Sequence, residues 1–333
     1  MTQTTATQTG ISLIEAVTQA MAYELAHDPD VLIMGEDIGK NGGVFRATLG
    51  LQERFGTRRV MDTPLAESML AGMAVGMASQ GLKPIIEIQF MGFIYPAYDQ
   101  IVNHLSRLRN RTRGRLSCPV VIRAPVGSGI RAPEHHSEST ESIFAHIPGL
   151  RVVIPGSPAR AYGLLLAAIR DPDPVIFLEP MRIYRKVKQI VPDDGVALPL
   201  DKCFVLKEGT DVTLISWGAS LMETMQAAQT LEKEGVSAEV IDVASIKPLD
   251  IDSILASVEK TGRCVIVHEA PRTCGVGAEI AAQIAEKALL SLRAPIMRVT
   301  GYDTIMPLYR LEYEYIPSEV RILDAVREAL AFG

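Results

Sequence analysis

Two segments of the chain combine residue types that proton transfer requires. Glu67 ends the segment Met61-Asp-Thr-Pro-Leu-Ala-Glu and precedes a run of small and apolar residues, 68–78. Burial among apolar neighbours favours the protonated form of a carboxyl, so Glu67 could exchange a proton with a ring nitrogen near neutral pH. The alternative is that Glu67 occupies the first turn of the helix it opens, where the helix dipole favours an acid.

The second segment is Val126-Gly-Ser-Gly-Ile-Arg-Ala-Pro-Glu-His-His136, which is long and rich in glycine for a plain connection. Loops of this kind often line a site, so His136 is a candidate proton carrier. It could instead be a polar residue that precedes a helix with Ser137 as its N-cap. The remaining histidines lack such a loop and are interpreted as structural: His27, His104, His146 and His268.

Composition limits the classes of function. A chain of 333 residues with 47% apolar residues can bury a large core, and its length favours two domains. A net charge of −6 argues against a nucleic-acid surface, and short, interrupted apolar runs argue against a membrane protein. Residues 1–10 have neither a signal core nor a transit-peptide pattern, so we expect a disordered lead in a cytoplasmic protein.

The four cysteines lack the spacing of a zinc site or a disulfide framework. Cys118 and Cys264 lie in apolar runs and are expected to be core thiols. The sequence therefore indicates a reducing compartment.

Strand-like apolar runs alternate with helical stretches, which predicts α/β domains with mostly parallel sheets covered on both faces. The pattern lapses in a proline-containing stretch after Glu179 and resumes at Asp211. We therefore expect a first domain over 11–185, a linker over 186–205 and a second domain over 206–333. The expected strands include Val31-Leu-Ile-Met, Pro84-Ile-Ile-Glu-Ile, Pro119-Val-Val-Ile, Arg151-Val-Val-Ile, Pro174-Val-Ile-Phe-Leu, Asp211-Val-Thr-Leu-Ile-Ser, Ala238-Glu-Val-Ile-Asp, Arg263-Cys-Val-Ile-Val and Pro295-Ile-Met-Arg-Val.

Helices are indicated by local signals. A Ser12-Leu-Ile-Glu15 capping box predicts a helix from residue 13, and a second helix is expected over 66–80. Gly275-Val-Gly-Ala-Glu superficially matches a dinucleotide-binding loop but lacks the third glycine. It is better explained as a helix N-terminus with close backbone packing.

Over nearly its whole length the chain resembles the β subunit of the thiamine-dependent first component of 2-oxo acid dehydrogenase complexes, of the pyruvate or branched-chain type. The resemblance implies a transketolase-like pyrimidine-binding domain followed by a transketolase C-terminal-like domain. The matching stretches are Gly35-Glu-Asp-Ile-Gly, Gly42-Gly-Val-Phe-Arg, Asp62-Thr-Pro-Leu-Ala-Glu, Glu87-Ile-Gln-Phe, Asp99-Gln-Ile, His136-Ser-Glu-Ser, Pro148-Gly-Leu-Arg-Val-Val, Asp173-Pro-Val-Ile-Phe-Leu-Glu-Pro and Val299-Thr-Gly-Tyr-Asp.

The resemblance implies roles for individual residues. Glu67 matches the glutamate that hydrogen-bonds the aminopyrimidine of thiamine diphosphate and promotes formation of the ylid that attacks a 2-oxo acid. Leu65, Gln89 and Phe93 match positions around that ring, although Phe93 could equally be core. His136 matches the histidine that assists protonation steps and acyl transfer to a lipoyl group.

The resemblance also implies a potassium ion held at Val120, Ala168, Asp171 and Asp173. Several relatives have Asn where this chain has Asp173, which changes the local charge and leaves the identity of the ion open. Without the resemblance, Asp171-Pro-Asp-Pro indicates a plain turn.

The cofactor site is expected to be shared with a second chain. Single-chain thiamine enzymes hold magnesium and the diphosphate with a Gly-Asp-Gly segment that is followed some distance later by an asparagine. This sequence has no Gly-Asp-Gly segment, and its last asparagine is Asn110. The resemblance therefore implies that an α subunit holds magnesium and the diphosphate. The implied assembly has two α and two β subunits. Helix 66–80, with its small residues, could make close contact across an interface, or it could pack against its own sheet.

The expected activity is oxidative decarboxylation of pyruvate, with acyl transfer to the lipoyl group of the acyltransferase component. Such an enzyme is an oxidoreductase that acts on an oxo group with a disulfide acceptor. Branched-chain 2-oxo acids are the alternative substrates, because one methylene of pocket size contributes only about 1–3 kcal/mol. Alternatives from other classes are a self-contained transketolase-like enzyme, which would need the missing diphosphate motif, and a non-catalytic assembly subunit.

Overall fold

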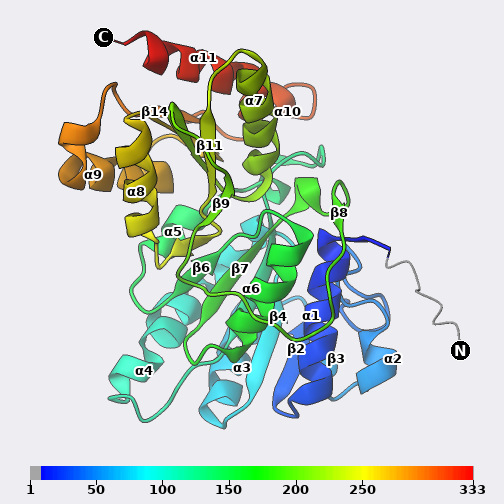
Figure 1. Cartoon of the computed structure of the whole chain (residues 1–333). Helices are drawn as coiled ribbons and strands as arrows, with labels where there is room; N and C mark the ends of the chain where they lie inside the picture. The colour runs from blue at the N-terminus through cyan, green and yellow to red at the C-terminus, as the bar shows by residue number, and fades with distance from the viewer. Residues whose placement is uncertain (1–8, 333) are drawn as a thin grey trace, which may run out of the picture.

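The computed structural model describes residues 9–332 and consists of two sheets, each covered by helices, with the second sheet above the first in Figure 1. Most of the expected lead, residues 1–8, lies outside the described residues. Among residues 9–332, none of the helices has the length and apolar character needed to cross a membrane.

The larger sheet has seven strands in the order β12-β6-β7-β5-β4-β2-β3. All neighbours are parallel except β12, which runs antiparallel to β6. The strands are β2 (Val31–Gly35), β3 (Val60–Asp62), β4 (Lys83–Glu87), β5 (Val121–Val126), β6 (Arg151–Val153), β7 (Val175–Pro180) and β12 (Ser245–Lys247). The expected strands of this half are confirmed, whereas β3 and β12 were not predicted.

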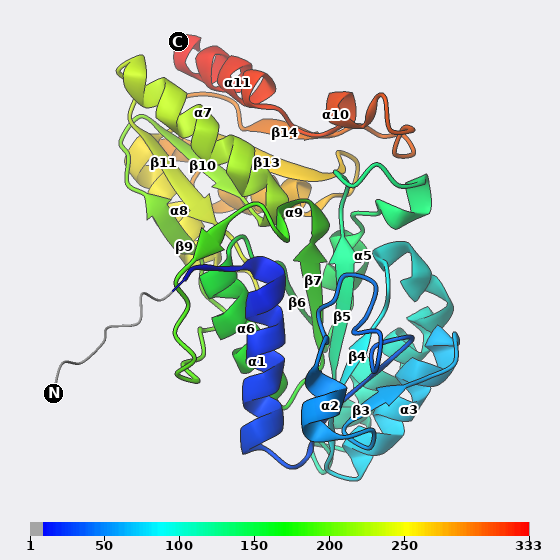
Figure 2. The same cartoon turned by 90° about the vertical axis from the view of Figure 1, so that its right-hand side faces the viewer.

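Helices cover both faces of this sheet. Alternate side chains of each strand enter different cores: Ile85 packs with α1 (Leu13–His27) and α6 (Pro158–Arg170), and Ile86 packs with α3 (Glu67–Ser79). Figure 2 shows α1 and α6 together on one side and α3 on the other. The predicted capping box of α1 is confirmed, because the Glu15 carboxylate accepts hydrogen bonds from the Ser12 N–H (2.7 Å) and hydroxyl (2.6 Å).

The second sheet has the order β14-β13-β10-β11-β9, and only β9 runs antiparallel to its neighbour. Helices α7 and α11 cover one face, and α8 and α9 cover the other. The strands are β9 (Phe204–Lys207), β10 (Val212–Ser216), β11 (Ala238–Asp242), β13 (Cys264–Pro271) and β14 (Met297–Gly301). The helices are α7 (Leu221–Lys233), α8 (Ile251–Thr261), α9 (Val276–Lys287), α10 (Glu312–Tyr315) and α11 (Glu319–Ala331).

Short elements complete the chain. Strands β1 (Ile11–Ser12) and β8 (Lys188–Gln189) form a two-stranded sheet. The others are α2 (Leu51–Phe55), α4 (Leu108–Arg111), α5 (Glu141–Ala145), and the short helices η1 (Met91–Ala97), η2 (Gln100–His104), η3 (Leu105–Arg107), η4 (Glu134–His136), η5 (Met181–Ile183), η6 (Gly218–Ser220) and η7 (Leu289–Ser291).

One apolar core is continuous between the two sheets. It contains Ile86 and Ile122 from the larger sheet together with Ile215 and Ile266 from the smaller one. The core also explains the cysteine prediction: Cys118 and Cys264 are buried, and burial raises the pKa of each thiol to about 12. Both are therefore neutral core residues, as expected.

Candidate functional site

The expected catalytic and cofactor-binding residues follow β3, β4 and β5, three parallel strands of the larger sheet. Loops leave the carboxyl ends of β5, β4, β2 and β3, which are adjacent in the sheet. In an open parallel sheet these ends meet at one edge, where ligands bind. Contacts join the loops there: the Thr63 N–H donates to the Gly35 carbonyl at 3.0 Å, and the Gly39 N–H donates to the Asp62 carboxylate at 2.6 Å.

His136 lies in an aromatic cluster at this edge. Its ring lies edge-on to Phe90, with centroids 4.5 Å apart, and to Phe93, with centroids 5.1 Å apart. The two phenylalanine rings are themselves 5.6 Å apart and come from the segment after β4. The structure thus brings together two expected site residues, His136 and Phe93, which belong to different loops.

A glycine allows this approach between loops. A side chain on Gly92 would collide with the carbonyl of His135, so the backbone of η1 lies directly against η4. Helix η4 contains both histidines, and the next helix, α5, begins only at Glu141 with Thr140 as its N-cap. The expectation that Ser137 is the N-cap of the following helix is therefore wrong, because Ser137 is the buried C-cap residue of η4.

The environment of His136 favours its neutral form. Burial, followed by the nearby positive charge of His135, lowers the pKa of His136 below its ordinary value. Its Nδ1 atom is buried and has no hydrogen-bond partner among the described residues. A neutral imidazole with an unused ring nitrogen can accept a proton from a bound molecule.

Glu67 is the first residue of α3, and it is half-buried. It therefore occupies the first helical turn, as the alternative interpretation requires, while its position beyond β3 keeps it at the sheet edge. The expectation that apolar neighbours of this chain enclose it is wrong. Leu65 is 70% exposed and Met69 is 38% exposed, so the apolar surface around Glu67 is open in the single chain.

Glu36 was not selected from the sequence as a site residue, although it belongs to a quoted stretch. It follows β2 directly, and burial, then the charges of Asp37 and Glu67, raise its pKa above the ordinary value. Two carboxyls from neighbouring loops thus interact at the edge of the sheet. The available signal was an acid immediately after a fully apolar strand, Val31–Gly35.

A buried ion network lies beneath the site. Arg123 of β5 donates to Glu87 of β4 at 2.9 Å and to both carboxylate oxygens of Glu179 of β7, at 2.6 and 2.9 Å. Glu179 also accepts the Tyr184 hydroxyl at 2.7 Å. Burial raises the pKa of Glu87, while Arg123 opposes that effect. The sequence analysis did not identify this ion network. The available signal was one of these three charged residues within each of three largely apolar strands.

The network fixes the strand ends that position the site. A buried guanidinium with bidentate and single carboxylate partners holds three adjacent strands in register. Gln89, an expected site residue, lies two positions beyond Glu87 and is half-buried. Gly43, from the loop after β2, packs on the Glu87 carboxylate, where a Cβ would lie 2.7 Å from Oε1.

The expected potassium residues lie at the opposite, amino end of β5 and β7. Both carboxylates are already paired: Asp171 with Arg151 at 2.9 Å, and Asp173 with Arg109 at 2.8 Å. Backbone carbonyls of the same segments are further oxygen donors for a cation, although the Val120 carbonyl also accepts the Val175 N–H at 2.9 Å. Ala168 lies in the last turn of α6, and its carbonyl cannot accept an N–H from residue 172, because that residue is proline.

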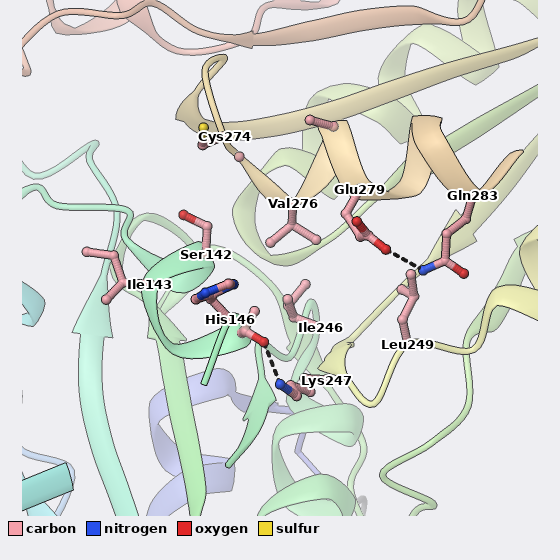
Figure 3. A pocket seen from close by; sticks show the side chains of 13 residues that line it. Ser142, Ile143, His146, Ile246, Lys247, Leu249, Cys274, Val276, Glu279 and Gln283 are labelled. Carbon is pink, nitrogen blue, oxygen red and sulfur yellow. Dashed lines mark hydrogen bonds between the residues drawn. The ribbon is translucent and has the colours of Figure 1, made fainter. Parts of the chain in front are cut away.

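A separate cavity of about 740 Å³ lies between α5, β12 and α9 (Figure 3). Its lining contains none of the expected site residues; His146, Lys247, Cys274 and Glu279 are among the side chains that face it. The Lys247 ammonium donates to the Ala145 carbonyl at 2.7 Å and to the Ile147 carbonyl at 3.0 Å. The cavity is thus distinct from the sheet edge that gathers His136 and Glu67.

The segment that superficially matched a dinucleotide loop is the start of α9, as the default interpretation predicted. Gly275 is the N-cap, and Gly275 and Gly277 both pack against the ring of His268. That ring stacks on Trp217, with centroids 5.0 Å apart. Glycine is needed here for close packing.

Comparison with known proteins identifies the family. The family described as "Transketolase, pyrimidine binding domain" matches residues 9–186, and "Transketolase, C-terminal domain" matches residues 201–322. The pyruvate dehydrogenase E1 component β subunit of Bacillus subtilis is 48% identical over 322 residues, which cover 97% of this chain and 99% of that protein. This chain belongs to the E1 β-subunit family. The corresponding protein of Staphylococcus aureus is 47% identical over the same proportion of both chains.

The fold of the family is also found in a solved structure of lower sequence identity. A chain described as a split-gene transketolase in an inactive β4 tetramer superposes with a TM-score of 0.80 at 24% identity. The superposition covers 97% of this chain and 99% of that chain. The expected pair of transketolase-like domains is therefore confirmed at the level of fold.

Proposed function

We propose that the chain is the β subunit of a pyruvate dehydrogenase first component. With an α subunit, it would decarboxylate pyruvate oxidatively and transfer the acetyl group to a lipoyl acyltransferase. The observation that supports this most directly is near-full-length identity of 48% to a pyruvate dehydrogenase E1 β subunit. The names of the relatives favour pyruvate over branched-chain 2-oxo acids, and an enzyme over an assembly subunit without catalytic function.

The site residues fit a pyrimidine ring of thiamine diphosphate. Glu67 offers a carboxyl at the sheet edge, Leu65 an exposed apolar surface, and Gln89 a half-buried amide in the segment after β4 that also contains Phe93. When bound, thiamine diphosphate supplies a nucleophilic carbon and an electron sink for decarboxylation. We assign Glu67 the exchange of a proton with a pyrimidine nitrogen, because it places a carboxyl at the sheet edge where the expected site residues gather.

We assign His136 a role in the protonation steps and in acyl transfer to the lipoyl group. Its neutral imidazole, oriented by Phe90 and Phe93, can take a proton from an incoming thiol or return one. The apolar rings exclude water from one side of the imidazole.

The diphosphate and its magnesium ion are assigned to the α subunit, because this chain has no Gly-Asp-Gly segment. We expect a heterotetramer of two α and two β subunits. Exposed apolar side chains support burial against another subunit: Leu65 just before α3, and Met69 and Met73 within it. We further propose the linker at 186–205, a cytoplasmic location, and a potassium ion at Val120, Ala168, Asp171 and Asp173. For that ion we assign the backbone carbonyls of these residues as ligands.

The experiment is reconstitution with the α subunit of the same organism. The purified complex is assayed for decarboxylation of pyruvate and of 3-methyl-2-oxobutanoate, with thiamine diphosphate, magnesium and an artificial electron acceptor. We expect activity with pyruvate to exceed that with the branched acid. Glu67→Gln should lower kcat by about 10²–10⁴-fold, because it removes the proton exchange and keeps the shape.

The control is Glu53→Gln, a change of an exposed residue in α2. Size-exclusion chromatography should show that all variants assemble equally. Near-normal turnover of an assembled Glu67→Gln complex would refute the proposed role, and a preference for the branched acid would refute the substrate.

A further inference from the structure

The loop after β5 is held by carboxylates from the second half of the chain. Glu312 of α10 accepts the backbone N–H of Gly129 at 2.6 Å and that of Arg131 at 3.4 Å. Glu269 of β13 accepts the backbone N–H of Ser128, and also its hydroxyl at 2.6 Å. Both carboxylates are buried, with Glu312 only 1% exposed and Glu269 8% exposed. Hydrogen bonds from N–H groups to buried carboxylates are strong because one partner is charged.

The glycines of the loop are required by these contacts. Gly127 and Gly129 have φ values of +87° and +93°, a region that other residues rarely adopt. A Cβ on Gly127 would lie 2.8 Å from the Glu269 carboxylate, and a Cβ on Gly129 would collide with the side chain of Arg182. The spacing Gly127-Ser-Gly129 therefore fits a loop that lies directly on charged groups.

Arg182 supplies the countercharge beneath the loop. Its guanidinium pairs with Glu223 of α7 at 2.9 Å and lies 3.9 Å from the Glu269 carboxylate. Above the loop, the Arg131 guanidinium lies 5.9 Å from the centre of the Tyr313 ring, next to Glu312. Elements of both halves thus converge on five loop residues, 127–131.

The held residues are continuous with the histidine segment. The Gly127 N–H donates to the Glu138 carbonyl at 2.9 Å, which closes the loop on itself around His136. Beyond Arg131 only four residues separate the held backbone from His136. The segment 132–137, which contains His136, is therefore held at both ends: by the contacts at 128–131 on one side and by the Gly127–Glu138 hydrogen bond on the other.

We infer that Glu269 and Glu312 are positioning residues that hold the backbone at 128–131 and thereby place His136 against Phe90 and Phe93. The second domain thus takes part in forming the site at the edge of the first sheet. The functional part of this inference rests on the proposed role of His136. The structural part does not, because it concerns the exchange of backbone amides.

The experiment uses the reconstituted heterotetramer and three variants of α10: Glu312→Ala, Glu312→Gln and the matched control Glu314→Gln. Glu314 is exposed on the same short helix. Hydrogen–deuterium exchange of peptides covering 127–136 is measured together with two rates: pyruvate decarboxylation with an artificial acceptor, and acetyl transfer to a lipoyl domain.

For Glu312→Ala we expect exchange at Gly129 and Arg131 to become about tenfold faster, because a charge-assisted acceptor is lost. The kcat of acetyl transfer should fall by a similar factor, with the KM for pyruvate little changed. Glu312→Gln keeps a neutral acceptor of the same shape and should recover part of both effects. Glu314→Gln should change neither.

Unchanged exchange in Glu312→Ala would overturn the inference outright. Faster exchange with unchanged acetyl transfer would overturn its functional part, provided that His136→Ala impairs transfer in the same assay. If His136→Ala also leaves transfer unchanged, the proposed role of His136 fails instead.

Discussion

At the scale of single residues, the site combines a carboxyl that opens a helix with a histidine that closes a short turn. Residue type and context made Glu67 and His136 candidates, and the family resemblance gave them roles; they follow β3 and β5, strands of the same parallel sheet that β2 and β4 separate. Phe90 and Glu36 were missed, because only the folded chain shows that they lie beside His136 and Glu67. Proximity between loops is a tertiary property that residue patterns do not encode locally.

His136→Ala is expected to impair acetyl transfer by about 10²-fold or more while affecting decarboxylation less, since it removes a proton carrier. The measurement is the ratio of the two rates in the reconstituted complex. His135→Ala is the matched control. His135 is exposed, and its charge contributes to the lowered pKa of His136.

The pH dependence of transfer gives a second check on this residue. The lowered pKa of His136 should place the acid limb of the transfer rate below the usual range of histidine. In His135→Ala, that limb should move to higher pH, because a nearby positive charge has been removed. An acid limb that does not move would argue that another group controls it.

At the scale of elements, the sequence predicted the strands of both sheets that read as continuous apolar runs. The missed strands have different signals. They are β3 and β12, with three residues each, and β9, with four; Pro248 follows β12 directly. Strands this short have too few residues for a periodic pattern, and their place in the sheet depends on partners that are distant in sequence.

The start of α9 supports a prediction about acid stability. His268 is fully buried against Trp217 and the glycines of α9, and burial lowers its pKa to about 3. In the unfolded chain, its pKa is about 6.5. The unfolded state therefore binds an additional proton between about pH 6.5 and 3, so this residue destabilises the fold progressively as pH falls through that window.

The variant His268→Phe keeps an aromatic ring on Trp217 and removes the titration. Thermal unfolding is measured between pH 7.5 and 4.5. Below pH 6.5, the free energy of unfolding of the wild type should fall more steeply than that of His268→Phe, by about 1.4 kcal/mol per pH unit. His27→Phe is the control, because His27 is exposed and its removal should leave the slope unchanged. Parallel pH profiles for wild type and His268→Phe would contradict the prediction.

At the scale of the whole molecule, the sequence indicated two α/β domains and a site that needs a second chain. It did not reveal how firmly the two halves are joined. Polar contacts cross between them: half-buried Arg160 of α6 lies 3.2 Å from buried Asp242 of β11, and the Trp217 indole donates to Glu141 at 3.2 Å. Such pairs consist of ordinary polar residues far apart in sequence, so no local signal marks them.

The segment 168–173 joins α6 to β7 at the end of the larger sheet opposite the site, and it contains three of the four proposed potassium ligands. If its carbonyls hold potassium, replacing potassium by tetramethylammonium at equal ionic strength should lower Tm by about 2–4 °C. Differential scanning calorimetry of the heterotetramer measures this. Asp173→Asn should retain the dependence on potassium, because the proposed ligands are carbonyls; equal Tm values in both salts would exclude a bound ion.

The pairing of β12 with β6 also determines when the larger sheet can be completed during synthesis. β12 lies in the second half of the chain, but it covers the edge of a sheet whose other strands end at Pro180. Until residue 247 has left the ribosome, β6 presents an open edge of unpaired backbone groups that can recruit strands from other chains. A chain that ended before β12 would keep that edge open permanently, and we expect such a chain to aggregate.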